Sequence, residues 1–278
     1  MLNRLNLGYA MSDAVQRPSS LVLGVRIDAS GWDNVVGQLV SWGAQRASRY
    51  ICICNVHSLV TAVRDPAFMQ AVNRADMATP DGMPVAWMLR ALGHEGQQRI
   101  NGPDLMWRYL AEAEKLGQVV SFYGSTEETI ALLREAMLRA YPKLRIGVMI
   151  SPPFRPLSDE ESSAYARQVN DANTSVMFVG MGCPKQEIWM SSRRGVISAA
   201  MVGVGAAFDY HAGTVKRAPI WMQRSGLEWL YRLVTEPRRL WRRYLVTNTI
   251  FAVMAFRQLI AVRREPLKEE AESSNAGH

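Results

Sequence analysis

An acidic residue in a short turn is the first candidate for chemistry. Asp81 stands in Thr79-Pro80-Asp81-Gly82, after a short apolar segment and before an apolar run at helical spacing. This pattern places Asp81 where a strand passes into a helix, and ligands bind at such strand ends in open α/β sheets. A carboxylate held there could act as a general base. It could instead cap the following helix by accepting hydrogen bonds from its free N–H groups, and the spacing alone favours the cap.

Glycines at three later strand ends are the second candidate. Gly124, the pair Gly180 and Gly182, and the pair Gly203 and Gly205 each follow a short apolar run. Glycine lets backbone N–H groups approach a diphosphate, and a helix N-terminus adds partial positive charge. Neither pair completes the Gly-x-Gly-x-x-Gly pattern, and there is no P-loop pattern. The alternative that these glycines only turn the chain stays open.

The elements that would hold these residues alternate along the chain. We expect strands at 21–25, 50–54, 77–78, 119–123, 144–150, 175–179 and 199–204, with amphipathic helices between them. This order predicts an α/β fold with a Rossmann-like, mostly parallel sheet flanked by helices. Asn55 then lies at a strand end like Asp81. His57 beside it is either a ligand contact or a partly exposed histidine at a helix start, and Ser30 to Asp33 resembles a capping box.

Composition and cysteine usage set outer bounds. The chain has 278 residues, of which 48% are hydrophobic and 21% charged, as in ordinary globular proteins. Cys52 and Cys54 lie in an apolar run, and Cys183 is far away in the sequence. These three give neither a disulfide framework nor metal-ligand spacing, so we expect core cysteines in a reducing compartment.

The positive charge is concentrated near the carboxyl end. Residues 232–264 contain eight arginines and one acidic residue, Glu236, so the rest of the chain is electrically neutral. After Glu236-Pro237, arginines alternate with Leu, Trp and Tyr, which is typical of a helix at a membrane interface. Each arginine near an anionic leaflet contributes about 1 kcal/mol. The alternative is a core-packing helix with a solvated basic face.

These observations divide the chain into four parts. Residues 1–20 have no secretory signal and are expected to form a flexible leader, in which Met11 could be the true start. We expect the α/β domain at 21–218, an arginine-rich helical appendage at 219–264 and a disordered tail at 265–278. The longest uncharged apolar stretch of the appendage, 244–256, is shorter than the roughly 20 residues of a spanning helix. The sequence therefore predicts a surface contact with the membrane and no span.

The motifs as a set resemble the WecG/TagA/CpsF glycosyltransferases, glycosyltransferase family 26. The resemblance covers roughly residues 21 to 245. The matching pieces, besides Asn55 and Thr79-Pro80-Asp81-Gly82, are Arg99-Ile100-Asn101-Gly102-Pro103-Asp104, Phe122-Tyr123-Gly124, Gly180-Met181-Gly182-Cys183-Pro184-Lys185-Gln186-Glu187, Gly203-Val204-Gly205-Ala206-Ala207-Phe208-Asp209, Gly213, Arg217-Ala218-Pro219, Gly226-Leu227-Glu228-Trp229-Leu230-Tyr231-Arg232-Leu233 and Glu236-Pro237-Arg238-Arg239.

The resemblance implies an inverting transferase that needs neither a metal nor a cofactor. It would move a sugar from a UDP-sugar to a polyprenyl-diphosphate-linked sugar. Asp81 aligns with the family's proposed base, and Arg99 and Gln186 align with pocket residues. Other residues implied in substrate binding are Asn55, Thr79, Asn101, Asp104, Gly124, Gly180, Gly182, Pro184, Glu187, Gly205 and Asp209. The arginines implied to bind a diphosphate or the membrane are Arg232, Arg238, Arg239, Arg242 and Arg243.

The sequence and the resemblance together predict a hexosyltransferase of exopolysaccharide or cell-surface glycan synthesis. We expect it to be peripheral, on the cytoplasmic face of the inner membrane, with an anionic membrane surface as partner, no nucleic acid, and an oligomer possible. Ile53 stands where many family members have a hydroxyl residue, which bears on the donor sugar. Two alternatives are a Rossmann-like oxidoreductase, which lacks its glycine fingerprint, and a non-enzymatic nucleic-acid binder using the basic tail.

Overall fold

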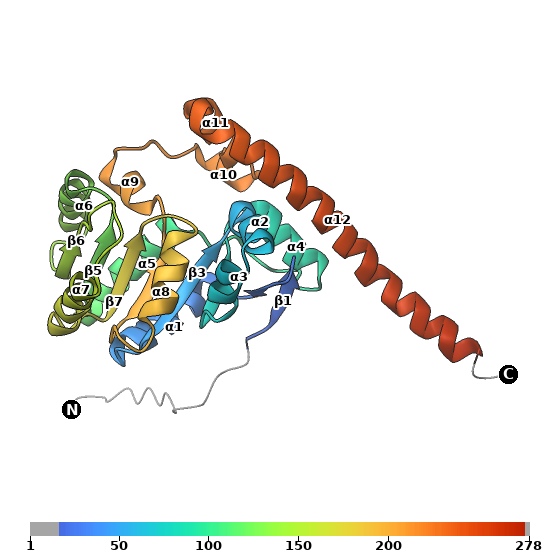
Figure 1. Cartoon of the computed structure of the whole chain (residues 1–278), viewed down its shortest axis with the longest axis horizontal. Coiled ribbons are helices and arrows are strands. Elements are labelled where there is room, and N and C mark those ends of the chain that lie inside the picture. Colours follow the sequence, from blue (N-terminus) through green and yellow to red (C-terminus); the bar gives the residue numbers. More distant parts are fainter. Residues whose placement is uncertain (1–16, 276–278) are drawn as a thin grey trace, which may run out of the picture.

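A six-stranded parallel sheet forms the centre of the protein (Figure 1). The computed structural model describes residues 17–275, and the side chains of residues 17–262. The sheet order is β4-β3-β8-β7-β5-β6, and every neighbouring pair is parallel. Its strands are β3 (Arg49–Cys54), β4 (Met77–Pro80), β5 (Val119–Gly124), β6 (Arg145–Ile150), β7 (Val176–Gly180) and β8 (Ala200–Gly203). The predicted Rossmann-like sheet is confirmed.

Helices cover both faces of this sheet and give two hydrophobic cores. One core contains side chains of α1 (Trp32–Ala44), α5 (Gly102–Leu116), α6 (Glu127–Ala140) and α9 (Ala207–Ala212). The other contains side chains of α2 (Val56–Arg64), α3 (Pro66–Asn73), α4 (Met83–Ala91), α7 (Asp159–Asp171) and α8 (Lys185–Arg193). A sheet buried on both faces explains why its strands read as apolar runs in the sequence.

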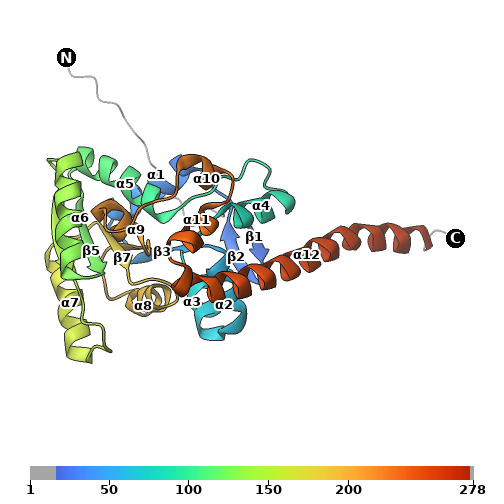
Figure 2. The same ribbon diagram turned by 90° about the horizontal axis from the view of Figure 1, so that it is seen from above.

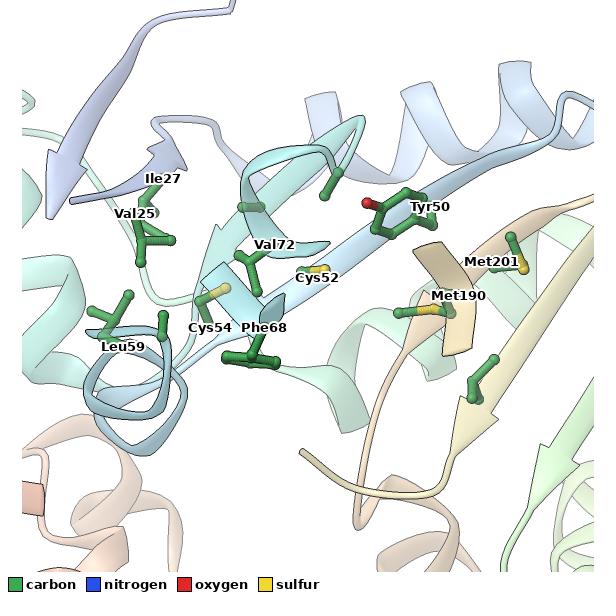
Figure 3. Packing of buried hydrophobic residues seen from close by; sticks show 14 of the residues in the cluster. Val25, Ile27, Tyr50, Cys52, Cys54, Leu59, Phe68, Val72, Met190 and Met201 are labelled. Atoms are coloured by element: carbon green, nitrogen blue, oxygen red, sulfur yellow. The ribbon is translucent and has the colours of Figure 1, made fainter. Parts of the chain in front are cut away.

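Strand β3 shows how its side chains are divided between the two cores. Tyr50, Cys52 and Cys54 belong to one core, whereas Ile51 and Ile53 belong to the other. Successive side chains of a strand point to opposite faces, so this alternation is expected. Figure 3 shows Cys52 and Cys54 among the apolar side chains of the first core. Both thiols are free and buried, as predicted for core cysteines.

The amino-terminal strand is a hairpin and not the single strand that we predicted at 21–25. Strand β1 (Ser19–Val22) pairs antiparallel with β2 (Val25–Asp28), and Leu23 and Gly24 turn between them with φ of 53° and 81°. The Asp28 carboxylate accepts a hydrogen bond of 2.6 Å from the N–H of Ala78 in β4. The hairpin therefore covers the β4 edge of the sheet, which would otherwise offer unpaired backbone groups.

Two other predictions for the amino-terminal region differ from the structure. The capping box predicted at residues 30–33 is absent, because the N-cap of α1 is Gly31 and makes no side-chain capping bond. The predicted leader ends earlier than residue 20, since β1 begins at Ser19. Residues 1–16 lie outside the described residues.

Three helices form the carboxyl-terminal appendage. They are α10 (Ile220–Arg224), α11 (Glu228–Thr235) and α12 (Pro237–Asn275), and α12 begins at the predicted break. Helix α12 packs on α2 and then extends away from the body (Figures 1 and 2). By length and composition alone, Pro237–Val262 is long and apolar enough to cross a membrane, and little of it is buried. Our prediction that no segment has this property was wrong. Residues 265–275, expected as a disordered tail, continue α12.

Candidate active site

A cavity of about 770 Å³ opens at the carboxyl ends of four adjacent strands, β4, β3, β8 and β7. The loops after these strands form the floor of the cavity, and α11 and the first part of α12 form a wall above it. Lining residues among those we predicted are Asn55, Asp81, Arg99, Gly180, Gly182, Gln186, Glu187, Gly205, Asp209, Arg232, Arg239 and Arg243. The fold thus brings together residues from both halves of the chain and the appendage.

Asp81 lies at the rim of this cavity, directly after β4. Its N–H donates to the carbonyl of Cys54 (2.8 Å), so its backbone continues the pairing of β4 with β3. The N-cap of α4 is Gly82, which makes no side-chain capping bond. The cap that the spacing favoured for Asp81 is therefore wrong. Instead, Oδ1 of Asp81 accepts a hydrogen bond of 2.9 Å from Nε of Arg99, and the side chain is 20% exposed.

Arg99 is held between two carboxylates. Besides the bond to Asp81, its Nη2 lies 2.6 Å from Oε2 of Glu228, the first residue of α11. Burial alone would lower the pKa of Arg99, but the charges of Asp81 and Glu228 raise it above its usual value. Arg99 is thus a permanent cation beside Asp81. Sequence reasoning gave Glu228 no role, although it stands in the quoted motif of residues 226–233.

Gln186 joins the two glycine loops of the cavity. Its Oε1 accepts hydrogen bonds of 3.1 Å from the N–H groups of Gly182 and Gly205, and its Nε2 donates to Oε1 of Glu187 (2.9 Å). The Gly182 and Gly205 N–H groups, which we expected near a diphosphate, are therefore already occupied. This geometry gives Gln186 a role in fixing the loops after β7 and β8.

Glu187 is a carboxyl group buried at the base of the cavity. Its residue is 1% exposed, and burial raises its pKa to about 7. The hydrogen bond from Gln186 opposes that rise without cancelling it. Glu187 therefore carries a proton for much of the time at neutral pH, whereas Asp81 is the carboxylate that reaches the open part of the cavity.

Several predicted site residues support the cavity without lining it. Thr79 is buried, and its hydroxyl lies 3.5 Å from the carbonyl of Ile100. Gly124 has a φ of 123°, and a Cβ there would lie 2.7 Å from the carbonyl carbon of Gly180. Pro184 precedes α8 at its N-cap position. These residues bring strand ends and loops into close contact.

Asn101 and Asp104 form a second supporting group. Asn101 caps α5 by accepting from the N–H of Asp104 (3.0 Å), and its Nδ2 donates to the Asp104 carboxylate (2.7 Å). Arg217 pairs with Asp104 and donates to Oδ1 of Asn101 (3.1 Å). This group ties the chain that leads into the appendage to α5.

The appendage arginines divide into two sets. Arg232, Arg239 and Arg243 line the cavity, whereas Arg238 and Arg242 are exposed and do not. His57 also lines the cavity, at the start of α2. Burial and then the charge of Arg243 lower the pKa of His57 to about 4, so the imidazole is neutral at physiological pH. Among the described residues, no group of three His, Cys, Asp or Glu side chains is placed to hold a metal ion.

Comparison with known proteins decides what kind of protein carries this site. A model of the glycosyl transferase WecG/TagA/CpsF family matches residues 21–265, which is most of the chain. The chain belongs to this family. The predicted resemblance is confirmed, and membership in a family of glycosyltransferases replaces the oxidoreductase and nucleic-acid alternatives.

Two curated relatives carry the same printed name, N-acetylglucosaminyldiphosphoundecaprenol N-acetyl-beta-D-mannosaminyltransferase. The protein from Bacillus subtilis (strain 168) is 31% identical over 202 residues, which is 72% of this chain and 77% of the relative. The protein from Bacillus spizizenii (strain W23) is 32% identical over 202 residues, 72% of this chain and 76% of the relative. These relatives transfer an amino sugar to a sugar on a polyprenyl diphosphate.

Proposed function

We propose that this glycosyltransferase moves a hexose-type sugar from a UDP-sugar to a polyprenyl-diphosphate-linked sugar, for exopolysaccharide or cell-surface glycan synthesis. The observation that carries the proposal is Asp81, a partly exposed carboxylate at the rim of a cavity whose opposite wall contains three arginines. The names of the two relatives support the lipid-linked acceptor. Their names give the sugars of the first pair to test, N-acetylmannosamine as the transferred sugar and an N-acetylglucosaminyl-diphosphate lipid as the acceptor. With the UDP donor proposed here, the first donor to test is UDP-N-acetylmannosamine.

In this proposal Asp81 is the general base. Only Oδ1 takes part in the bond to Arg99, which leaves Oδ2 to accept the proton of the acceptor hydroxyl as that oxygen attacks the anomeric carbon. Attack from the side opposite the leaving UDP inverts the anomeric configuration. Glu187 is less suitable as the base, because a residue that is 1% exposed does not reach the acceptor.

The appendage arginines would stabilise the diphosphate charge. Arg232, Arg239 and Arg243 face the cavity, and arginine matches phosphate oxygens with paired donors. Charge that develops on the departing UDP would then be stabilised by guanidinium groups, so we propose a reaction that needs no metal and no cofactor. Asn55 and Asp209, which also line the cavity, are the proposed sugar contacts.

We further propose that the appendage holds the enzyme on the cytoplasmic face of the membrane. Helix α12 exposes Trp241, Leu245 and Phe256 together with Arg238 and Arg242. Aromatic and aliphatic side chains beside arginines suit an anionic lipid surface. The same helix lines the cavity, so a lipid-linked acceptor would reach Asp81 without leaving the membrane.

The reaction is tested with the purified full-length chain, radiolabelled UDP-hexoses and a short polyprenyl-diphosphate sugar. We expect acceptor-dependent UDP release, a labelled lipid-linked disaccharide and no loss of rate with EDTA. Lack of transfer from every UDP-hexose would contradict the proposal. A strong loss of rate with EDTA would contradict its metal-independent form.

Membrane attachment is tested by sedimentation with phosphatidylglycerol vesicles. Replacing Arg238 and Arg242 with Gln removes about 2 kcal/mol of attraction, which should weaken binding roughly 30-fold. The matched control replaces Arg134 and Arg139, two exposed arginines of α6 in the body. Equal losses in both double variants would mean that net charge, and not the appendage, holds the protein on the vesicle.

A further inference from the structure

We propose that Glu228, from helix α11 of the appendage, is a positioning residue that acts through Arg99 to orient the Asp81 carboxylate. This inference rests on the proposed role of Asp81 as the base. It assigns a function in sugar transfer to an appendage side chain that forms an ion pair with Arg99.

The first support is the geometry of the three side chains. Nε of Arg99 donates a hydrogen bond of 2.9 Å to Oδ1 of Asp81, and Nη2 of Arg99 forms an ion pair with Oε2 of Glu228 at 2.6 Å. The side chains of Arg99, Asp81 and Glu228 are 13%, 20% and 17% exposed. A guanidinium group is planar and its donors are fixed in direction. Asp81 and Glu228 therefore share one edge of the Arg99 guanidinium group, so the ion pair with Glu228 limits how Arg99 can turn toward Asp81.

The second support is the packing of the turn that carries Glu228. Gly226 has a φ of 77°, and a Cβ there would lie 3.1 Å from Cβ of Met83 and 3.2 Å from Trp87. The turn before α11 thus lies directly on α4, the helix that follows Asp81. Glu228 is also at the N-terminus of α11, where a carboxylate is favoured by the helix dipole. An apolar contact and an ion pair hold this turn at one place.

The chemical consequence concerns how many oxygens of Asp81 remain available. With Glu228 present, Arg99 bonds to one oxygen of Asp81, and the other can accept a proton. Without Glu228, the guanidinium is free to turn and pair with both oxygens in the two-pronged geometry that arginine and carboxylates favour. That pairing would occupy the base. The appendage would then be required for proton abstraction as well as for binding the diphosphate.

The test compares Glu228→Leu with the wild type in the full-length chain, using the UDP-release assay with lipid-linked acceptor. We expect kcat to fall roughly 10- to 100-fold, with the KM for the UDP-sugar within about twofold of the wild-type value. Glu228→Gln keeps an acceptor for Nη2 and should recover most of kcat. Glu112→Leu is the matched control, because Glu112 pairs with Lys115 on the surface of α5, away from the cavity.

A double-mutant cycle separates positioning from a structural effect. If Glu228 acts through Arg99, then adding Glu228→Leu to Arg99→Gln causes no further loss of kcat. The inference would be overturned if the kcat losses of the two single variants multiplied in the double variant. It would also be overturned if Glu228→Leu left kcat unchanged, or raised KM while kcat stayed normal. If Glu228→Leu does not fold, Glu228→Asp takes its place, since its shorter side chain no longer reaches Nη2. A wild type that transfers no sugar would refute the proposed function itself, which is a different result.

Discussion

The buried carboxyl of Glu187 makes the stability of this protein depend on pH in a defined direction. Its pKa is about 7 in the folded protein and 4.5 in the unfolded chain. The folded state thus binds this proton more tightly, so Glu187 favours folding at low pH and this contribution is lost as the pH rises from 4.5 through 7. The pKa values differ by about 2.5, and each unit corresponds to about 1.4 kcal/mol, so ionised Glu187 costs about 3 kcal/mol above neutral pH.

The variant that tests this is Glu187→Gln. Glutamine keeps the oxygen that accepts from Gln186 and removes the charge. The amide NH₂ of the variant takes the place of Oε2 of Glu187, which has no hydrogen-bond partner within the described part of the chain. Burying this NH₂ without a partner costs about 1 kcal/mol of folding free energy at every pH. The stability of the variant relative to the wild type should therefore improve by about 2 to 3 kcal/mol between pH 5 and pH 8.

The assay is urea unfolding of both proteins at pH 5 and pH 8, without substrates. The other titrating groups are common to both chains, so their contributions cancel in the difference. Glu112→Gln is the control, because it removes a surface carboxyl of α5. At a conversion of about 2–4 °C per kcal/mol for a protein of this size, thermal unfolding gives a second readout. A difference between variant and wild type that is equal at the two pH values would refute the reasoning.

Three further predictions concern the site. Asp81→Asn should lower turnover roughly 10²- to 10⁴-fold while UDP binding, measured by calorimetry, stays within a few-fold; full activity would exclude Asp81 as the base. Gln186→Ala leaves two loop N–H groups without their acceptor and should cost about 1–3 kcal/mol of unfolding free energy, measured by urea unfolding; an unchanged midpoint would contradict the joining role. Gly124→Ala places a Cβ 2.7 Å from Gly180 at a φ of 123°, so we expect a loss of more than about 2 kcal/mol, whereas Gly96→Ala, which meets no atom within 4 Å, should cost little.

The sequence predicted the central sheet well, because buried parallel strands have a simple signature. Residues 50–54 of β3 and 176–179 of β7 form short runs of buried, mostly apolar side chains, which are followed by Asn55 and Gly180. The carboxyl ends of parallel strands meet at one edge of the sheet, so placing Asn55 and Asp81 at strand ends was enough to place them together.

Other features depend on contacts that local sequence does not encode. The hairpin turn was missed because Leu23, at a φ of 53°, is not a typical turn residue. The pairing of Arg99 with Glu228 joins positions that are far apart in the sequence, and only the packing of α11 on the body brings them together. The apolar stretch of α12 was ended too early, at Phe256, because Arg257 follows it; one arginine can extend to the surface of a long apolar helix.

The strand order has a consequence for how the enzyme is made. Strand β3 lies between β4, which follows it soon in the chain, and β8, with Arg49 paired to Ala200. A nascent chain that has left the ribosome only as far as β7 lacks the strand that joins the two halves of the sheet, and pairings over such long separations form slowly. Strand β8 is followed in the chain by α9 and then by α10 to α12. The strand that completes the floor of the cavity and the helices of the appendage therefore emerge close together in synthesis.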